Sequence, residues 1–247
     1  MEHNASLLDI EYFLERYAKN KKVRLLDVGC VDGKKVLGIL DRGGFDDVMY
    51  VGLDSVYWDA ENSRPSSANG RTFVYGDACN LPFEDSDFDL VIMSHVFEHI
   101  EDSERLCSEI KRVTKKNGHV LVIVPLEKGG MVGFINRNRN LWKHLRYLLS
   151  WLRILPYNPV SPHVHFKSYK EYSDYFKKKF EVVESYTRGS FGMLALSFFH
   201  ETLMGFARQK INVMEIVERN FPRFFQNTYR KNTWFKMDAT FILKPKD

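Results

Sequence analysis

Cysteine is scarce in this chain, and its three occurrences among 247 residues predict neither a covalent nor a metal framework. Cys30, Cys79 and Cys107 are an odd number without close pairing, which argues against a disulfide scaffold and a cysteine zinc site. The chain also lacks an apolar run long enough to cross a bilayer and a basic start ahead of an apolar stretch. We therefore expect a cytoplasmic protein.

What is present is the composition of a globular protein with a large core. Apolar residues make up 44% of the chain and aromatic residues 14%, while the net charge is only +4. Residues 128–170 hold eight of the 36 Lys and Arg residues and no acidic residue, leaving 28 basic against 32 acidic residues elsewhere. The positive charge is therefore local, and the length fits a single domain over residues 1–247.

The apolar pattern predicts alternating helices and strands through the first half of the chain. Helices are expected at about 7–17 with Ser6 as N-cap, after residue 33 up to Gly43, and at about 103–113 with residues 115–118 closing the last one. Short runs rich in β-branched residues predict strands at 23–28, 48–53, 72–75, 88–93 and 120–124. This alternation indicates parallel strands joined by right-handed crossovers.

The second half is less regular, but it adds a helix and two strands. Ser168 and Glu171 form a capping box ahead of a helix, and residues 180–186 predict a strand. Residues 237–244 alternate apolar and polar side chains, as expected of a strand at or near a sheet boundary. The fold class is therefore α/β, a doubly wound, mostly parallel seven-stranded Rossmann-like sheet. The segments at about 126–166 and 189–235 are predicted to be helical cap insertions over the carboxyl edge of its strands.

A glycine turn follows the first predicted strand. Gly29 and Gly33 let the backbone approach a ligand closely, and the helix that follows begins with free N–H groups. A dinucleotide fingerprint requires glycines in the order G-x-G-x-x-G, but counting from Gly29 places Val31 and Lys34 at the other two positions. The pattern therefore indicates a cofactor turn of another kind.

The turn and several later motifs resemble the class I S-adenosylmethionine-dependent methyltransferases, in particular the small-molecule, type 11-like group. The first motif of that group is close to D-V-G-C-G-x-G, and the one departure in this chain is Val31 at the middle glycine. The resemblance covers about residues 20–126 well and 163–186 weakly. The matching segments are residues 27–33 (DVGCVDG), Asp54, residues 76–78 (GDA), residues 81–83 (LPF), residues 88–100 (FDLVIMSHVFEHI) and residues 118–125 (GHVLVIVP).

The resemblance implies S-adenosylmethionine as cofactor and a role for each strand end. Asp54 would accept the ribose hydroxyls, and Asp77 would accept the adenine amino hydrogens beside the Ala78 N–H group. The residues implied at or near the methionine end are Asp27, Gly29, Gly33, Ser94, His95 and His99. For any one of these acids the alternative is a local role, because an Asp after a strand commonly caps a turn.

A second pattern competes for part of the same stretch. His95, Glu98 and His99 spell H-x-x-E-H, which on a long helix can hold zinc. Here the pattern starts at a strand end inside the methyltransferase motifs, so we expect no metal. We expect His95 and His99 to orient the loop beside the sulfonium, and Glu98 to be an exposed helix carboxylate.

His163 and His165 are the candidates for a general base. Methyl transfer is a displacement at an activated carbon, so the protein chiefly aligns donor and acceptor and adds a base when the acceptor carries a proton. An imidazole can accept a proton near neutral pH, so either histidine would serve as such a base. The alternative is that they hydrogen-bond the backbone of the cap.

Residues 137–155 combine basic and aromatic side chains at helical spacing. This stretch fits an acidic substrate, a lipid surface or nucleic acid, or a cap helix that packs on the sheet. We predict methyl transfer to O, N or C of a small-molecule or lipid- or glycan-linked acceptor. Peripheral contact with a membrane is compatible with this prediction. One alternative is an RNA (tRNA) methyltransferase that uses the basic segment 128–170, which the lack of a separate RNA-binding module in the sequence disfavours. The other is a non-catalytic relative that binds the cofactor. The acceptor and the oligomeric state stay open.

Overall fold

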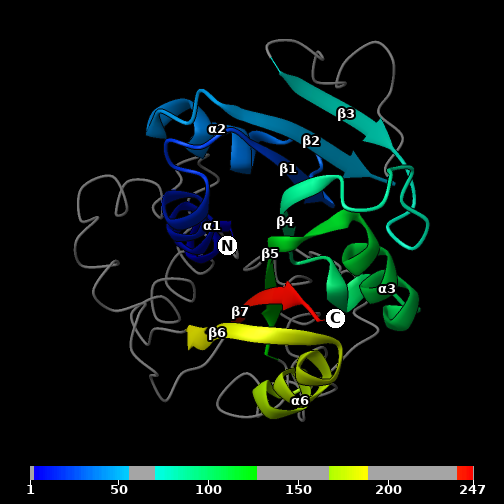
Figure 1. Ribbon diagram of the computed structural model, residues 1–247. Helices are drawn as coiled ribbons and strands as arrows, with labels where there is room; N and C mark the ends of the chain where they lie inside the picture. The colour runs from blue at the N-terminus through cyan, green and yellow to red at the C-terminus, as the bar shows by residue number, and fades with distance from the viewer. Residues whose placement is uncertain (1–2, 56–69, 127–166, 189–237, 247) are drawn as a thin grey trace, which may run out of the picture.

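The computed structural model describes residues 3–55, 70–126, 167–188 and 238–246, which form a twisted sheet between two layers of helices (Figure 1). The elements in chain order are α1 (His3–Tyr17), β1 (Val23–Val28), α2 (Lys34–Gly43), β2 (Val48–Asp54), β3 (Arg71–Tyr75), β4 (Phe88–Ser94), the short 3₁₀ helix η1 (Phe97–His99), α3 (Ser103–Val113), β5 (Thr114–Pro125), α6 (Tyr169–Lys179), β6 (Phe180–Arg188) and β7 (Asp238–Pro245).

The seven strands lie in the order β3-β2-β1-β4-β5-β7-β6. The first five are parallel, and β7 runs antiparallel to both β5 and β6. From β1 the chain winds outward to β2 and β3, then returns to place β4 on the other side of β1. The crevice outside the carboxyl ends of β1 and β4 is thus the switch point where ligands bind in open sheets of this kind.

The two faces of the sheet bury separate apolar clusters. Along β5, Val120, Val122 and Val124 join the cluster covered by α3 and α6, while Leu121 and Ile123 join the cluster covered by α1 and α2. Both faces are covered, so the central strands are apolar without a polar side. The predicted doubly wound, mostly parallel α/β fold is confirmed.

Most element boundaries fall close to the predicted ones, with two differences. Ser6 lies inside α1 and does not begin it. Residues 115–118, expected as the end of a helix, belong to β5, because Phe88 pairs with Thr114 and extends the strand backwards from Val120. The capping box of α6 is present, with the Ser168 N–H donating to Glu171 Oε2 at 2.7 Å.

A buried polar cluster ties α1 to the last two strands. The Asp9 carboxylate, 1% exposed, accepts hydrogen bonds from Tyr186 and Arg188 of β6 and, at 2.8 Å, from the Thr240 hydroxyl of β7. On the surface, Arg16 pairs with Glu184 of β6 at 2.7 Å. These bonds fix one helix against strands that lie at the far end of the sequence, and so fix its position over the sheet.

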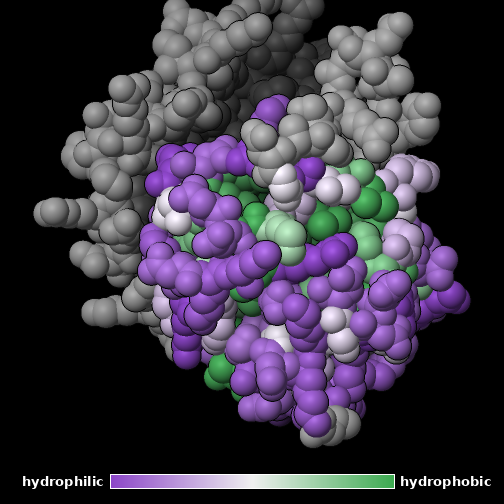
Figure 2. Space-filling view, turned by 45° about the horizontal axis from the view of Figure 1, so that its top comes forward, coloured by the Kyte–Doolittle hydropathy of each residue, from purple (hydrophilic) through white to green (hydrophobic). Residues whose placement is uncertain are grey.

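Hydrophilic residues cover most of the face in Figure 2, and hydrophobic residues come to the surface in a band across its upper part. In the part of the chain that the structure describes, no helix combines the length and the apolar character needed to cross a membrane. The predicted cap insertions at about 126–166 and 189–235 lie almost wholly outside the described residues, and the single-domain organisation stays a prediction.

Candidate functional site

The turn after β1 has an unusual backbone, with three residues in the left-handed region. Gly29 and Gly33 have φ angles of 71° and 72°, and Val31 between them has a φ angle of 53°. At position 29 a side chain is also excluded by space, because a Cβ atom would come within 2.3 Å of Val96 Cγ2. Valine is branched at Cβ and adopts this conformation at a cost, so Val31 stores backbone strain at the mouth of the site.

Asp54, the last residue of β2, holds this turn in place. Its Oδ2 atom accepts a hydrogen bond from the Val31 N–H group at 2.7 Å, and the side chain is buried. The Leu53 carbonyl accepts a second bond from the Gly29 N–H group, also at 2.7 Å. The end of β2 therefore shapes the turn after β1, and the strained valine is held by a charged acceptor.

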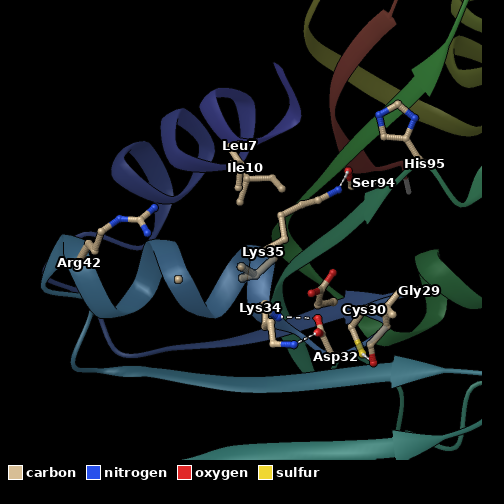
Figure 3. A pocket seen from close by; sticks show the side chains of 14 residues that line it. Leu7, Ile10, Gly29, Cys30, Asp32, Lys34, Lys35, Arg42, Ser94 and His95 are labelled. Atoms are coloured by element: carbon tan, nitrogen blue, oxygen red, sulfur yellow. Dashed lines mark hydrogen bonds and ion pairs between the residues drawn. The ribbon is translucent and has the colours of Figure 1, made fainter. Parts of the chain in front are cut away.

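A cavity of about 570 Å³ lies beside this turn, over the carboxyl ends of β1 and β4 and against α1 (Figure 3). Its walls come from the end of β1 and the glycine turn, residues along the length of α2, the end of β4 and two apolar residues of α1. The lining residues are Leu7, Ile10, Asp27, Gly29, Cys30, Val31, Asp32, Lys34, Lys35, Val36, Gly38, Arg42, Ser94 and His95.

Asp27 is the buried acid of this cavity. It lies near the end of β1, is 5% exposed, and its Oδ2 atom accepts a hydrogen bond from the Tyr50 hydroxyl at 2.9 Å. Burial raises the pKa of Asp27 to about 7, although the Tyr50 bond and the nearby Lys35 ammonium act in the opposite direction. A carboxyl group with this pKa gains from a positive partner that arrives with a ligand.

Two lysines begin α2, and their side chains lie in different surroundings. Lys34 is largely exposed and its ammonium pairs with Asp32 at 2.5 Å. Lys35 extends across the cavity, and its Nζ atom donates to Ser94 Oγ at the end of β4 at 3.3 Å (Figure 3). The cavity therefore contains a cation and an acid from neighbouring elements.

The cavity brings together four of the residues predicted from the sequence, namely Asp27, Gly29, Ser94 and His95. Sequence reasoning missed Lys35 and the two α1 residues Leu7 and Ile10. The position of Lys35 carried a usable signal, because helical side chains lean toward the N-terminus and a residue in the first turn of α2 leans toward the strand ends.

The other predicted cofactor residues lie outside this lining. Gly33 caps α2, Asp54 binds the Val31 N–H group of the glycine turn, and His99 is exposed in η1. Asp77 follows β3, is exposed, and accepts a hydrogen bond from the Cys79 N–H group at 2.8 Å, while the adjacent Ala78 is buried. Asp77 thus makes the local turn bond that is common for an Asp after a strand, and its contact with the adenine amine stays a prediction.

The H-x-x-E-H stretch forms a buried carboxylate between two imidazoles. Glu98 is only 1% exposed, so the expectation of an exposed carboxylate was wrong; it lies in η1, which packs against β5, and not on a longer surface helix. Its Oε1 atom is 3.5 Å from His95 Nδ1 and 4.0 Å from His99 Nε2. Within the described ranges, no three His, Cys, Asp or Glu side chains are grouped as metal ligands.

The two histidines predicted as bases, His163 and His165, lie outside the described residues, as does the basic stretch at 137–155. These predictions concern the acceptor and not the cofactor. The described residues therefore include the predicted cofactor-binding residues and not the predicted bases.

Comparison with known proteins places a recognised domain over this site. The family model described as "Methyltransferase domain" matches residues 26–122. A demethylmenaquinone methyltransferase of Renibacterium salmoninarum is 33% identical over 101 residues, which cover 38% of this chain and 43% of the relative. An uncharacterized methyltransferase of Schizosaccharomyces pombe is 31% identical over 116 residues, covering 44% of this chain and 41% of the relative. The chain spans about half or less of the length of these relatives.

Among solved structures, phosphoethanolamine N-methyltransferase 2 of Haemonchus contortus, in complex with S-adenosyl-L-methionine, superimposes with a TM-score of 0.57. The match covers 98% of this chain and 52% of that one at 16% sequence identity. At this identity the likeness concerns the fold, which agrees with the strand order found here.

Proposed function

We propose that this chain binds S-adenosylmethionine and transfers its methyl group to a small-molecule or lipid-linked acceptor, because the model described as "Methyltransferase domain" matches residues 26–122. The observation that carries the proposal is the cavity at the β1/β4 switch point, where a glycine turn, the buried Asp27 and the Lys35 ammonium converge.

The residues present fit the chemistry of this cofactor. S-adenosylmethionine carries a ribose diol, an adenine amine, a sulfonium and an amino-acid tail with both an ammonium and a carboxylate. Asp54 offers an acceptor at the end of β2 for the diol, while Asp27 and Lys35 offer opposite charges for the tail. The cavity volume of about 570 Å³ is that of a small-molecule site.

The role of the chain in the reaction is alignment. When bound, S-adenosylmethionine supplies a methyl carbon activated by the positive sulfur beside it. Asp27 and Lys35 would fix the tail, Asp54 would fix the ribose, and Leu7 and Ile10 of α1 would keep water from one wall of the cavity. Fixing the donor in this way removes orientational freedom from the displacement, which is the main contribution a protein makes to such a step.

The acceptor is proposed more broadly than the donor. Two relatives are named for a quinone or a hydroquinone, a demethylmenaquinone methyltransferase and the 2-methyl-6-phytyl-1,4-hydroquinone methyltransferase 2 of rice. These names support an acceptor of the quinone or hydroquinone class. His163 and His165 stay the candidate bases for an acceptor that loses a proton.

Titration calorimetry with S-adenosylmethionine and S-adenosylhomocysteine tests the cofactor assignment. Asp54→Ala removes the ribose acceptor and the bond to Val31, so we expect about a 100-fold loss of affinity for both ligands. The control is Asp46→Ala, an exposed acid just before β2 and so near the opposite end of that strand from Asp54, which should bind as the unaltered protein does.

Transfer of label from methyl-labelled donor to demethylmenaquinol and to extracted lipids then tests turnover. Tight cofactor binding with no labelled product from any acceptor would support the non-catalytic alternative. An unaltered protein that binds neither nucleoside would refute the proposal.

A further inference from the structure

We propose that Glu109 and Arg112 of α3 are positioning residues for the nucleobase of the cofactor. Their side chains hold the backbone of residues 81–83, and this backbone sets where the Asp77 carboxylate lies. The inference rests on the proposed function and extends it, because neither residue lines the cavity beside the glycine turn or lies at a strand end.

Asp77 lies at the start of a tight turn after β3. Its carboxylate accepts the Cys79 N–H group at 2.8 Å, and its carbonyl accepts the Asn80 N–H group at 2.9 Å. Ala78 and Leu81 are buried in the apolar cluster that α3 and α6 cover, whereas Asp77 itself is exposed. The position of the Asp77 carboxylate therefore depends on how the backbone that follows it is held.

That backbone is held by side chains of α3. The Leu81 N–H group donates to Glu109 Oε2 at 2.8 Å. Arg112 donates from Nη2 to the Leu81 carbonyl at 3.0 Å and from Nη1 to the Phe83 carbonyl at 2.7 Å. Both backbone groups of Leu81 and the carbonyl of Phe83 are thus bound by two residues of one helix.

The Arg112 guanidinium joins this backbone to the helix in a way that depends on its shape. Besides the two carbonyls, it donates to Glu109 Oε1 and Oε2, both at 2.8 Å, and to Asp85 Oδ1 at 2.9 Å. These five bonds match the five N–H donors of a guanidinium. The bonds from Arg112 also hold the pKa of Glu109 below its ordinary value of 4.5, so the pair is charged at neutral pH.

One face of α3 carries the residues that make these bonds. Arg105, Glu109 and Arg112 are spaced by four and three residues, which places them on the same side of a helix. Arg105 Nε adds a bond to the Cys79 carbonyl at 2.8 Å. Ile110, next to Glu109, is fully buried in the core, so the helix is a fixed support for the turn.

The experiment compares two nucleosides that differ only in the base. S-inosylhomocysteine has a carbonyl oxygen where S-adenosylhomocysteine has the adenine amine. Calorimetry should show that the unaltered protein prefers the adenine compound by at least about 10-fold, because the amine donates to Asp77. Arg112→Met should lower this preference by about 3- to 10-fold, through weaker binding of the adenine compound.

Matched variants separate base recognition from folding. Lys111→Met removes the neighbouring cation of α3, which makes none of these bonds, and should leave the preference unchanged. Arg112→Lys should restore only part of it, because one ammonium cannot reach all five acceptors. Arg105→Ala removes only the bond to Cys79 from an exposed side chain. It should fold like the unaltered protein and lower the preference by about 2- to 3-fold.

The outcomes point to different failures. An unchanged preference in Arg105→Ala and in folded Arg112→Met would overturn the inference, as would equal weakening of both nucleosides. If Arg112→Met does not fold, Arg105→Ala alone decides. An unaltered protein that binds both nucleosides equally well would also overturn the inference while leaving the proposed function intact. Binding of neither nucleoside would refute the proposed function itself.

Discussion

The two halves of the carboxyl edge of the sheet are built in different ways. At β1 and β4, the groups facing the cavity come from separate elements: Asp27 from a strand, Lys35 from a helix and Ser94 from another strand. At β2 and β3, the acids are already bonded to nearby backbone, Asp54 to the Val31 N–H group and Asp77 to the Cys79 N–H group. The first half presents its polar side chains to the cavity. In the second half the acids bind backbone N–H groups, Asp54 that of the turn after β1 and Asp77 that of its own turn.

This difference has an energetic side. A carboxylate that accepts a backbone N–H bond is stabilised before any ligand arrives. Asp27 is in the opposite position, because its burial raises its pKa to about 7 and penalises the charged form. The β1/β4 half therefore gives up folding stability that a cationic ligand group would restore.

The largest effect is expected from Asp27→Asn. The pKa of Asp27 is about 7 in the folded state against an ordinary value of 3.8, so between these values the folded protein holds a proton that the unfolded chain has lost. Stability of the unaltered protein therefore falls as the pH rises through this window, and the loss is complete above it. The variant has no carboxyl group to titrate at this position and so does not lose stability in this way. Its free energy of unfolding minus that of the unaltered protein should be about 1–3 kcal/mol more positive near pH 8 than near pH 4.5.

Urea unfolding at the two pH values measures this difference. The same variant should bind S-adenosylmethionine more weakly, since the buried acid no longer attracts the ammonium. Asp46→Asn is the exposed control and should show no pH-dependent difference. A stability change for Asp27→Asn that is the same at both pH values would show that burial does not perturb this carboxyl group.

A smaller effect is expected from two substitutions of Asp77, which separate its turn bond from its predicted contact with adenine. Asp77→Asn keeps an oxygen for the Cys79 N–H group and loses an acceptor for the adenine amine, so stability should hold while cofactor affinity falls about 3- to 10-fold. Asp77→Ala should in addition lose about 0.5–1.5 kcal/mol of stability. Unchanged affinity in both variants would leave Asp77 with the turn bond alone.

The smallest effect is expected from Val31→Gly, which restores the glycine of the family pattern. The φ angle of 53° strains valine and not glycine, while glycine adds entropy to the unfolded chain. The net gain should be about 0.5–1 kcal/mol in the free energy of unfolding, with cofactor affinity within about threefold because the N–H bond to Asp54 remains. A loss of stability would show that the turn is relaxed with valine in place.

Much of the fold could be predicted from the sequence because both faces of the sheet are covered. Short runs of β-branched residues such as residues 120–124 then predict buried strands. Their alternation with amphipathic helices indicates the α/β fold class. Residues 115–118 were misassigned because lysines followed by Asn and Gly are typical of a helix end. Thr114 pairs with Phe88, so these residues continue β5. Pairing with a strand elsewhere in the chain cannot be predicted from the local sequence.

The sequence predicts the residues of the candidate site that lie at or just after strand ends. It does not predict the residues that line the cavity because a helix packs there. Asp27, Gly29 and Ser94 follow from the motif order, and they do line one cavity. Leu7 and Ile10 line it because α1 is held by Asp9, whose partners Arg188 and Thr240 lie far along the chain. The burial of Glu98 was missed for a related reason, since one turn of 3₁₀ helix packed on β5 leaves no amphipathic pattern to read.

Arg188 and Asp238 face each other in register where β6 ends and β7 begins. The segment of residues 189–237 is therefore joined to the sheet at two paired residues, Arg188 and Asp238. The buried Asp9 carboxylate accepts a hydrogen bond from Arg188 and holds one of these two ends in place. Because the pairing of β6 with β7 fixes both ends of this segment, its length and sequence can change without moving either strand. The sheet thus tolerates large changes between Arg188 and Asp238 at no cost in strand pairing.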